Sequence, residues 1–352
     1  MCGKEQPLAS YDLIVRGAGI IGLSCAWTAV RRGAKVLVVD PAGPGAGSSG
    51  GIVGALAPHV PENWNAKKQF QLESLLMAPG FWAEVAAAGG ADPGYCATGR
   101  LQPVQDEAAL SLARQREETA ALYWQDKAEW RVMPAAQDDW TPIAPTGWMI
   151  RDSLSAHLHP RRACKALVAA LRTYGVQVVT QTDAVAPTLW ATDVAGLADL
   201  TATHRRSMGT GVKGQAALLS HDARGKAQLL VGGVHIIPHA DGTVAVGSTS
   251  ERDYATPDQT DAQLDAVIEK AREAVPALAG ARVIARWAGV RPRARSRAPM
   301  LGGWPGRPGH FVANGGFKIG FGMAPKVAEV MADLMLDGQD AIPEGFRVED
   351  NF

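Results

Sequence analysis

The hydrophobic pattern near the start of the chain predicts a buried strand, a helix and a second strand in close succession. Residues 11–16 have an uninterrupted apolar centre, the pattern of a strand that is covered on both faces. Small and apolar residues recur with helical spacing as far as residue 32, and Gly33 follows as a helix stop. Residues 35–39 form a second apolar run that ends at Asp40. This order of elements is typical of an α/β domain.

Apolar stripes and apolar runs farther along the chain predict further elements. The patterns indicate helices over residues 69–88, 108–125, 158–171, 260–277 and 323–336, and strands over residues 176–180 and 310–313. Gly338 lies just past the last of these helices and marks its end. Four tryptophans fall among turn signals in the middle of the chain; we expect them to pack a smaller domain, although one can line a pocket: Trp124, Trp130, Trp140 and Trp148.

A glycine motif occupies the turn between the first strand and the first helix. Residues 17–22 read Gly-Ala-Gly-Ile-Ile-Gly, which matches G-x-G-x-x-G. Gly17 allows a sharp turn, Gly19 lets a pyrophosphate approach the backbone, and Gly22 lets the helix and the strand pack closely. The free N–H groups of the helix N-terminus face the phosphates with a partial positive charge. The flanking strand, helix and acid are all correctly spaced, so the motif predicts a bound dinucleotide.

The residues that flank this motif narrow the choice of dinucleotide. Asp40 can accept hydrogen bonds from both ribose hydroxyls of the adenosine, and it would repel a 2′-phosphate, which disfavours NADP. Arg16 is unusual, since an apolar residue normally precedes the first glycine; it either reaches the phosphates or points to solvent.

Three later segments favour FAD over NAD. Residues 45–59 form a loop rich in Gly, Ser and small apolar residues, too apolar for a surface linker and suited to a pyrophosphate and a flat ring. Residues 287–302 form the second segment. The third, residues 310–336, reads as a strand, a glycine-rich loop and a helix. Such a unit can aim a second helix N-terminus at the first site, where it would stabilise the negative charge of a reduced flavin at N1/O2.

Composition and charge exclude several other functions. The 352 residues carry 35 basic and 35 acidic side chains, so no net charge indicates a nucleic acid or an anionic membrane as partner. No apolar run is long enough to span a membrane, and residues 1–10 lack the apolar region of a secretory signal. The four cysteines form no C-x-x-C pair and no zinc-type spacing, so we expect reduced thiols in a cytoplasmic protein and no metal site: Cys2, Cys25, Cys96 and Cys164.

Taken in order, the motifs resemble those of the D-amino-acid oxidase superfamily of FAD-dependent oxidoreductases, in its glycine oxidase and sarcosine oxidase branch. The resemblance covers nearly the whole chain, and the order and spacing of its pieces are more specific than any one of them. The pieces are the glycine motif with Asp40, the loop 48–58, His159-Pro160, and residues 212–215, 236–238, 242, 247–249, 287–292, 299–302 and 315–325.

The resemblance implies a fold and a set of cofactor contacts. It implies an α/β FAD-binding domain of the glutathione-reductase type, Rossmann-like and discontinuous, over residues 10–85, 155–215 and 300–352. An antiparallel-sheet cap over residues 86–154 and 216–299 would form the substrate pocket. We expect the FAD to be non-covalent, because no cysteine lies in the final substrate-side loops. The implied contacts of FAD are Gly17, Ala18, Gly19, Ile20, Ile21, Gly22, Asp40, Pro41, Ser48, Ser49, Gly50, Gly54, Ala55, Leu56, Gly214, Arg291, Gly316, Phe317, Lys318, Ile319 and Gly320.

The family's pattern also points to residues on the substrate side. Arg291 stands where the family's substrate arginine stands, and a guanidinium fork can hold a carboxylate in a fixed plane; otherwise it pairs with the flavin or a structural acid. Lys318 stands where the glycine oxidase branch has a second arginine. It either holds the carboxylate as a point charge, lies next to the flavin, or is a solvated loop residue. His235 replaces a pocket tyrosine, and His239 follows it, we expect on the same strand face. These departures put glycine itself in doubt as the substrate.

Two stretches lie outside the family's usual pattern. Arginines alternate at positions 291, 293, 295 and 297, which would place them on one side of an extended strand. They indicate either a solvated basic edge, which we favour for Arg295 and Arg297, or a substrate with extra negative charge. Residues 183–196 are too few for the small three-stranded meander that the family commonly has there.

We therefore expect an FAD-dependent enzyme that oxidises the C–N bond of an amino acid or N-substituted amino acid by hydride transfer to flavin N5. The alternatives are a dehydrogenase that passes electrons to a quinone or carrier protein, and a flavoprotein subunit that works only in a complex. The expected partners are a small amine or amino acid and oxygen or another electron acceptor, and a homo-oligomer stays open.

Overall fold

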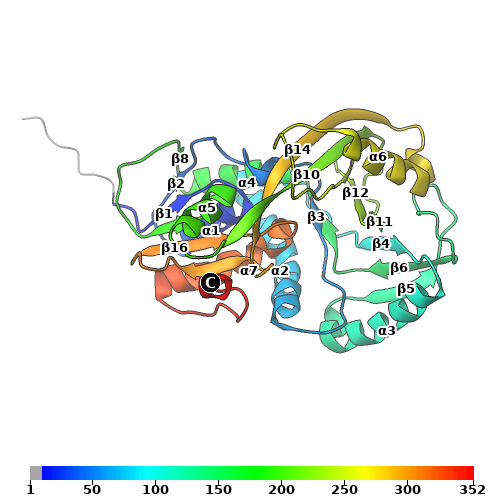
Figure 1. Ribbon diagram of the computed structural model, residues 1–352, viewed down its shortest axis with the longest axis horizontal. Coiled ribbons are helices and arrows are strands. Elements are labelled where there is room, and N and C mark those ends of the chain that lie inside the picture. The colour runs from blue at the N-terminus through cyan, green and yellow to red at the C-terminus, as the bar shows by residue number, and fades with distance from the viewer. Residues whose placement is uncertain (1–9) are drawn as a thin grey trace, which may run out of the picture.

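The computed structural model describes residues 10–352, which fold into two parts that lie side by side (Figure 1). One part contains a six-stranded sheet and the other an eight-stranded sheet. Cys2 lies outside the described residues. So do residues 1–9, on which the expectation of no secretory signal rests. In the described part, no helix has the length and apolar character needed to cross a membrane.

The predicted strand–helix–strand unit forms the centre of the six-stranded sheet. Strand β1 (Leu13–Arg16) is followed by helix α1 (Ile20–Arg31) and strand β2 (Val36–Val39), and the two strands pair in parallel. Leu13 and Val15 face one hydrophobic cluster, whereas Ile14 faces another on the opposite side of the sheet. Burial on both faces explains why the sequence of β1 is continuously apolar rather than alternating.

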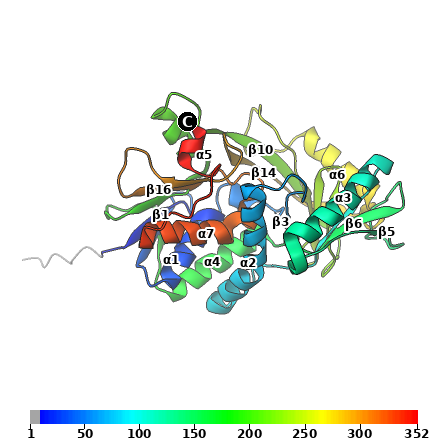
Figure 2. The same cartoon turned by 90° about the horizontal axis from the view of Figure 1, so that it is seen from below.

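The sheet has helices on both faces (Figure 2). Its strand order is β15-β16-β9-β1-β2-β8, which brings together strands from the start, the middle and the end of the chain. Helices α1, α2, α4 and α7 pack together on one face, and α5 lies on the other. The remaining elements of this part are α2 (Ala66–Gly89), α4 (Pro160–Thr173), β8 (Val178–Val179), β9 (Thr188–Trp190), α5 (Asp193–Ala202), β15 (Met300–Gly303), β16 (His310–Asn314) and α7 (Gly320–Asp337).

The second part of the molecule, which we call the cap, contains the eight-stranded sheet, and this sheet is mainly antiparallel. Two long strands, β10 (Gly209–Ser220) and β14 (Arg282–Ala294), pair with each other and run from the first part into the cap (Figure 1). Helices α3 (Glu107–Trp124) and α6 (Ala262–Ala274) match two predicted helices. The other strands of this sheet are β4 (Arg100–Pro103), β5 (Trp130–Pro134), β6 (Trp148–Asp152), β11 (Gln228–Val231), β12 (Val234–Pro238) and β13 (Thr243–Gly247).

Most predicted elements match observed ones, and three details differ. The prediction contains neither β9 nor α5, because it interpreted residues 183–196 only as too few for the family's meander. Helix α7 starts three residues before the predicted helix, at Gly320. Strand β14 ends at Ala294, so the arginine alternation stops there: Arg295 and Arg297 lie exposed beyond the strand, and Arg297 has a φ of 62°.

A short two-stranded sheet joins the two parts. Strands β3 (Ala55–Leu56) and β7 (Ala156–His157) pair antiparallel. Three histidines gather at this junction: His157 on β7, His159 after it, and His239 just past β12. His239 donates from Nε2 to the Ile52 carbonyl at 2.9 Å, and its ring lies 4.5 Å from that of His159. Burial lowers the pKa of both His157 and His239 to about 4, so both rings are neutral at pH 7.

We expect Gly22→Ala to destabilise the protein although alanine is the better helix former. A Cβ at residue 22 would lie 2.0 Å from the Gly17 carbonyl oxygen, inside the turn that starts α1. This overlap should lower the free energy of unfolding by about 1–3 kcal/mol. The measurement is urea unfolding, with Gly280→Ala as the matched control because a Cβ there meets nothing within 4 Å. Equal stability of the two variants would contradict the packing role of Gly22.

We also expect stability to fall as the pH drops from about 6.5 to 4. An unfolded histidine binds a proton near pH 6.5, whereas the folded His157 and His239 bind one only near pH 4. In this window the unfolded state takes up protons that the folded state does not, which costs up to about 1.4 kcal/mol per pH unit for each ring. Unfolding curves at pH 7, 6, 5 and 4 measure the slope, and His157→Gln should reduce it. An unchanged slope in that variant would exclude His157 as a source.

Candidate active site

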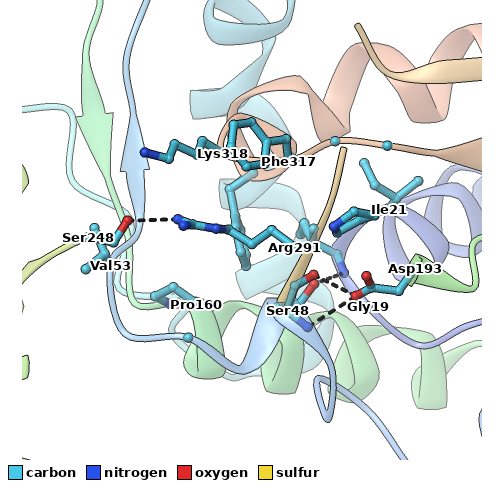
Figure 3. Close-up of a pocket in the computed structure, with 18 of the residues that line it drawn as sticks. Gly19, Ile21, Ser48, Val53, Pro160, Asp193, Ser248, Arg291, Phe317 and Lys318 are labelled. Atoms are coloured by element: carbon cyan, nitrogen blue, oxygen red, sulfur yellow. Dashed lines mark hydrogen bonds between the residues drawn. The ribbon is translucent and has the colours of Figure 1, made fainter. Parts of the chain in front are cut away.

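An open cavity lies where the first part of the molecule meets the cap, and its empty space, with the solvent at its mouth included, is about 1040 Å³ (Figure 3). Its walls come from the first glycine turn, the loop after β2, the start of α5, strand β14 and the loop between β16 and α7. The predicted site residues that line it are Gly19, Ile20, Ile21, Ser48, Ser49, Ala55, His235, Arg291, Gly316, Phe317, Lys318 and Gly320. The fold thus brings together residues that lie up to 300 positions apart.

The first glycine turn has the geometry that the motif predicts. Gly17 has a φ of 107°, and a Cβ there would lie 2.2 Å from the Ala191 carbonyl oxygen. Gly19 is the N-cap of α1 and lines the cavity. The N-terminus of α1 has no acidic residue in its first turn and no capping side chain from Gly19, so its positive end faces the cavity. One donor there is used by Ser49, whose Oγ accepts from the Ile20 N–H at 2.9 Å.

Asp40 lies at the end of β2, beside this turn. Its carboxylate accepts hydrogen bonds from the Ala18 N–H at 2.7 Å and from the Ala42 N–H at 2.9 Å. These bonds hold the side chain in one orientation at the edge of the site, although it does not line the cavity itself. The guanidinium of Arg16 lies over the Trp190 ring, 5.1 Å from its centroid, so among the described residues its contact is with an aromatic side chain.

The second glycine loop approaches the cavity from the far end of the chain. Gly315 has a φ of 74°, and the chain turns there from β16 into the loop that leads to α7. The Phe317 N–H donates to the Pro292 carbonyl at 2.9 Å, which ties the loop to β14. The N-terminus of α7, like that of α1, has no acidic residue in its first turn and no side-chain cap. Two helix N-termini therefore converge on one cavity.

Arg291 is buried and held by the cap strands. Its Nη1 donates to Ser248 Oγ at 2.8 Å, and its Nη2 donates to the carbonyl oxygens of Thr249 at 2.8 Å and Lys213 at 3.3 Å. Its Nε has no hydrogen-bond partner among residues 10–352. A Cβ at Gly214 would lie 2.1 Å from Nη2, so this glycine leaves room for the guanidinium. Burial lowers the pKa of Arg291 to about 10, which still leaves it charged at neutral pH.

Lys318 and His235 lie on the wall that this cavity shares with a second one of about 550 Å³. Within the described part of the chain, Lys318 has no hydrogen-bond or ion-pair partner, and its side chain extends to the same side as that of Arg291 (Figure 3). Desolvation, followed by the charges of Arg291 and Arg293, lowers the pKa of Lys318 to about 8. Burial, followed by the charges of Arg100 and Lys318, lowers the pKa of His235 to about 3, so its ring is neutral.

The other predicted cofactor residues do not line this cavity. Gly22 and Gly54 are packing positions, since a Cβ at either would lie 2.0 Å from a backbone oxygen. Leu56 is fully buried in the core. The complete set of predicted residues that do not line the cavity is Gly17, Ala18, Gly22, Asp40, Pro41, Gly50, Gly54, Leu56, Gly214 and Ile319.

Asp193 lines the cavity but is absent from the residues predicted from sequence. Its Oδ2 accepts from the Ser48 hydroxyl at 2.8 Å and from the Ser48 N–H at 3.3 Å (Figure 3). Its backbone is left-handed, with a φ of 57°. Burial raises the pKa of its carboxyl group, and the hydrogen bonds from Ser48 oppose that rise. The signal that could have revealed it is an acid just after the strand at residues 188–190, which the prediction did not contain.

These observations fit FAD as the group that the site holds. The glycine positions leave the backbone bare where a pyrophosphate would lie, and the hydroxyls of Ser48 and Ser49 lie beside the N-terminus of α1. The loop at residues 316–320 and the N-terminus of α7 would face the flavin end. Within the described part of the chain, Asp193 is the one acidic side chain that lines the cavity, so little opposes a dianionic pyrophosphate.

Comparisons with known proteins agree with this geometry. Residues 12–334 match the sequence profile of the family described as FAD dependent oxidoreductase. A glycine oxidase of Pseudomonas putida is 27% identical over 374 residues, which cover 96% of this chain and 99% of that protein. Among solved structures, glycine oxidase from Geobacillus kaustophilus has a TM-score of 0.82 at 18% identity and covers 96% of this chain and 98% of its own. Iminodiacetate oxidase from Chelativorans sp. has a TM-score of 0.82 at 19% identity, covering 95% and 98%.

We expect Asp193→Ala to weaken FAD binding and Asp193→Asn to leave it close to that of the unchanged protein. Alanine removes the acceptor for Ser48 and fits a left-handed backbone poorly, whereas asparagine retains an acceptor and tolerates that backbone. The loss of one charge-assisted hydrogen bond should raise the dissociation constant of FAD about tenfold or more. Fluorescence titration of the apoprotein measures it. Tight binding by the alanine variant would show that Asp193 does not position the Ser48 loop.

Proposed function

Because the chain belongs to the family of FAD dependent oxidoreductases, we propose that it oxidises the C–N bond of an amino acid or N-substituted amino acid. When bound, FAD accepts the hydride from the carbon next to the nitrogen. The residues of the chain then have to bind the substrate and hold that carbon in one orientation, so that other orientations of the substrate are excluded. The observation that supports this function most directly is that a cation, Lys318, and a neutral imidazole, His235, lie on the wall common to the cofactor cavity and the second cavity.

The substrate's carboxylate is held by Lys318, with Arg291 behind it. Most donors of Arg291 are already bonded to Ser248, Thr249 and Lys213, so this guanidinium is a fixed positive charge with few free N–H groups. Lys318 is exposed to both cavities, and its ammonium has no hydrogen-bond or ion-pair partner among residues 10–352. The free ammonium is the better candidate for direct contact with the carboxylate, and the arginine adds to the positive field.

His235 holds the substrate's nitrogen as a hydrogen-bond acceptor. Its pKa of about 3 means that the ring does not carry a proton to donate as an acid at neutral pH. A neutral ring nitrogen can accept a hydrogen bond from the N–H of the substrate, which fixes the position of the substrate's nitrogen. Lys318 and His235 together fix two points of the substrate, and two points limit how the carbon between them can turn.

The relatives support the same reaction class. Glycine oxidases match across nearly their whole length, and iminodiacetate oxidase has the same fold, so oxidation of small amino acids is the class that fits this chain. The electron acceptor is proposed to be oxygen, with a quinone or carrier protein as the alternative.

We expect purified holoprotein to lose its visible flavin absorbance anaerobically with an amino acid or N-substituted amino acid. Matched amines that lack the carboxylate should reduce the flavin at least about tenfold less efficiently, because the anchor for the carboxylate stays unused. Stopped-flow absorbance measures the reduction. Subsequent peroxide formation in air identifies an oxidase, and dye reduction without peroxide identifies a dehydrogenase. If the isolated holoprotein is reduced by no substrate in the panel, this function is wrong.

We expect carboxylate binding to weaken as the pH rises above about 8. Lys318 is charged below its pKa of about 8 and neutral above it, so its attraction for an anion is lost on the alkaline side. Acetate is a suitable probe because it has no amine that titrates in this range, and its binding is read from the flavin spectrum between pH 6.5 and 10. Lys318→Arg should bind acetate equally well over that range. A profile in the unchanged protein that stays flat to pH 10 would remove Lys318 as the anchor.

A further inference from the structure

The second cavity extends from the shared wall into the cap. It is lined by Ala55, Ala57, Pro58, His59, Gln71, Arg100, Leu230, His235, Lys318, Ile319 and Gly322. A substrate whose carboxylate lies at Lys318 would therefore have a further polar surface within the same space. The residue that decides the character of this surface is Arg100, the first residue of β4.

Arg100 is fixed from behind by a buried carboxylate. Its Nε donates to Asp152 Oδ2 at 2.8 Å, and Asp152 is fully buried. The other oxygen of Asp152 accepts from the Ser155 N–H at 2.8 Å, which holds the carboxylate itself in place. Among residues 10–352, neither Nη group of Arg100 has a hydrogen-bond partner, and Arg100 lines the cavity. Its orientation is therefore set by Nε, and its terminal N–H donors remain available.

The rest of the wall is neutral. Gln71 accepts from the His59 N–H at 2.7 Å and donates from Nε2 to the Ala57 carbonyl at 3.1 Å, so these two polar groups are occupied with each other and with the backbone. Burial lowers the pKa of His59, and the ring of His235 is also neutral. Among residues 10–352, no carboxylate lines the cavity. The charged side chains that line this cavity are thus two cations, Arg100 and Lys318, at separate positions on its wall.

We propose that Arg100 binds a second carboxylate, so that the preferred substrates are amino acids or N-substituted amino acids with two carboxylate groups. The proposal rests on the proposed function, and it names the substrate class of that same site. The first carboxylate lies at Lys318 and Arg291, and the second reaches the two Nη groups of Arg100, which present a planar fork suited to a carboxylate. The arginine alternation had suggested a substrate with extra negative charge. We assign the recognition of that charge to Arg100 of β4, because Arg295 and Arg297 lie exposed in a turn.

The test compares substrates with one and two carboxylates. The panel pairs glycine and N-methylglycine with N-(carboxymethyl)glycine and both enantiomers of aspartate and glutamate. Rapid anaerobic flavin reduction gives the dissociation constant and the limiting rate for each compound. We expect the best dicarboxylate to bind about 10- to 100-fold more tightly than the best monocarboxylate, the gain from one well-formed charge-assisted contact.

The variant that tests Arg100 is the double change Arg100→Gln and Asp152→Asn, because removal of the arginine alone would leave Asp152 buried and unpaired. It should weaken dicarboxylate binding about 10- to 100-fold and change monocarboxylate binding no more than about twofold. The matched control is Arg286→Gln with Asp265→Asn, an exposed pair joined at 2.5 Å that lies outside both cavities. The control should alter neither. Succinate and acetate, titrated against the flavin spectrum, give the same comparison without turnover.

The outcomes separate the two proposals. If no compound of either class reduces the flavin, the proposed function fails. If monocarboxylates reduce it and dicarboxylates bind no better, or if the Arg100 double variant weakens both classes equally, only the role of Arg100 is overturned. Variant protein that retains FAD and melts at the temperature of the control excludes misfolding as the reason for weaker binding.

Discussion

The structure depends on the parallel pairing of two strands on either side of β9. Strand β1 pairs in parallel with β9 on one side, and β16 pairs in parallel with β9 on the other. Their carboxyl ends therefore lie at one edge of the sheet, and each is followed by a glycine turn and a helix. This topology places the N-termini of α1 and α7, which are some 300 residues apart in sequence, at the same cavity. The positive ends of two helix dipoles therefore face one anionic cofactor. Together they give a stronger positive potential than either helix provides alone.

Two of the five non-glycine residues with a positive φ among residues 10–352 lie at the same edge. Asp193 and Phe317 both have positive φ angles, 57° and 43°, and both line the cavity. Such conformations cost free energy for residues with a side chain, and they persist where the surroundings hold them. Asn314 helps to hold this conformation, because its Nδ2 donates to the Asp193 carbonyl at 2.8 Å and so links the end of β16 to the start of α5. The strained loops are thus tied to the sheet that determines where they lie.

The cap contributes charge that is fixed in position. Arg291 is held by Ser248, Thr249 and Lys213, and Arg100 is held by Asp152. Each cation has a buried framework behind it, which limits the entropy lost when an anion binds. The histidines close to them are neutral because burial lowers their pKa, so the field at the shared wall comes from the arginines and from Lys318. A site of this kind favours carboxylates by orientation as well as by charge.

Local sequence determined much of the cofactor site. The apolar runs of β1 and β2, the spacing of Gly17, Gly19 and Gly22, and the strand, loop and helix at residues 310–336 could be read directly, because strand burial and tight turns are properties of a few adjacent residues. The family resemblance added FAD as the cofactor, and the matched sequence profile confirmed that cofactor.

Only the tertiary structure decided which distant side chains meet. Strand β9 is three residues long and has no readable periodicity, so neither it nor the placement of Asp193 after it could be predicted. Arg100 looks like any polar residue at the start of a strand until the sheet brings Asp152 of β6 behind it and Lys318 onto the same cavity. The charge alternation at positions 291–297 suggested a basic strand edge, yet the chain leaves the strand after Ala294. Long-range packing set these positions, and no local pattern records them.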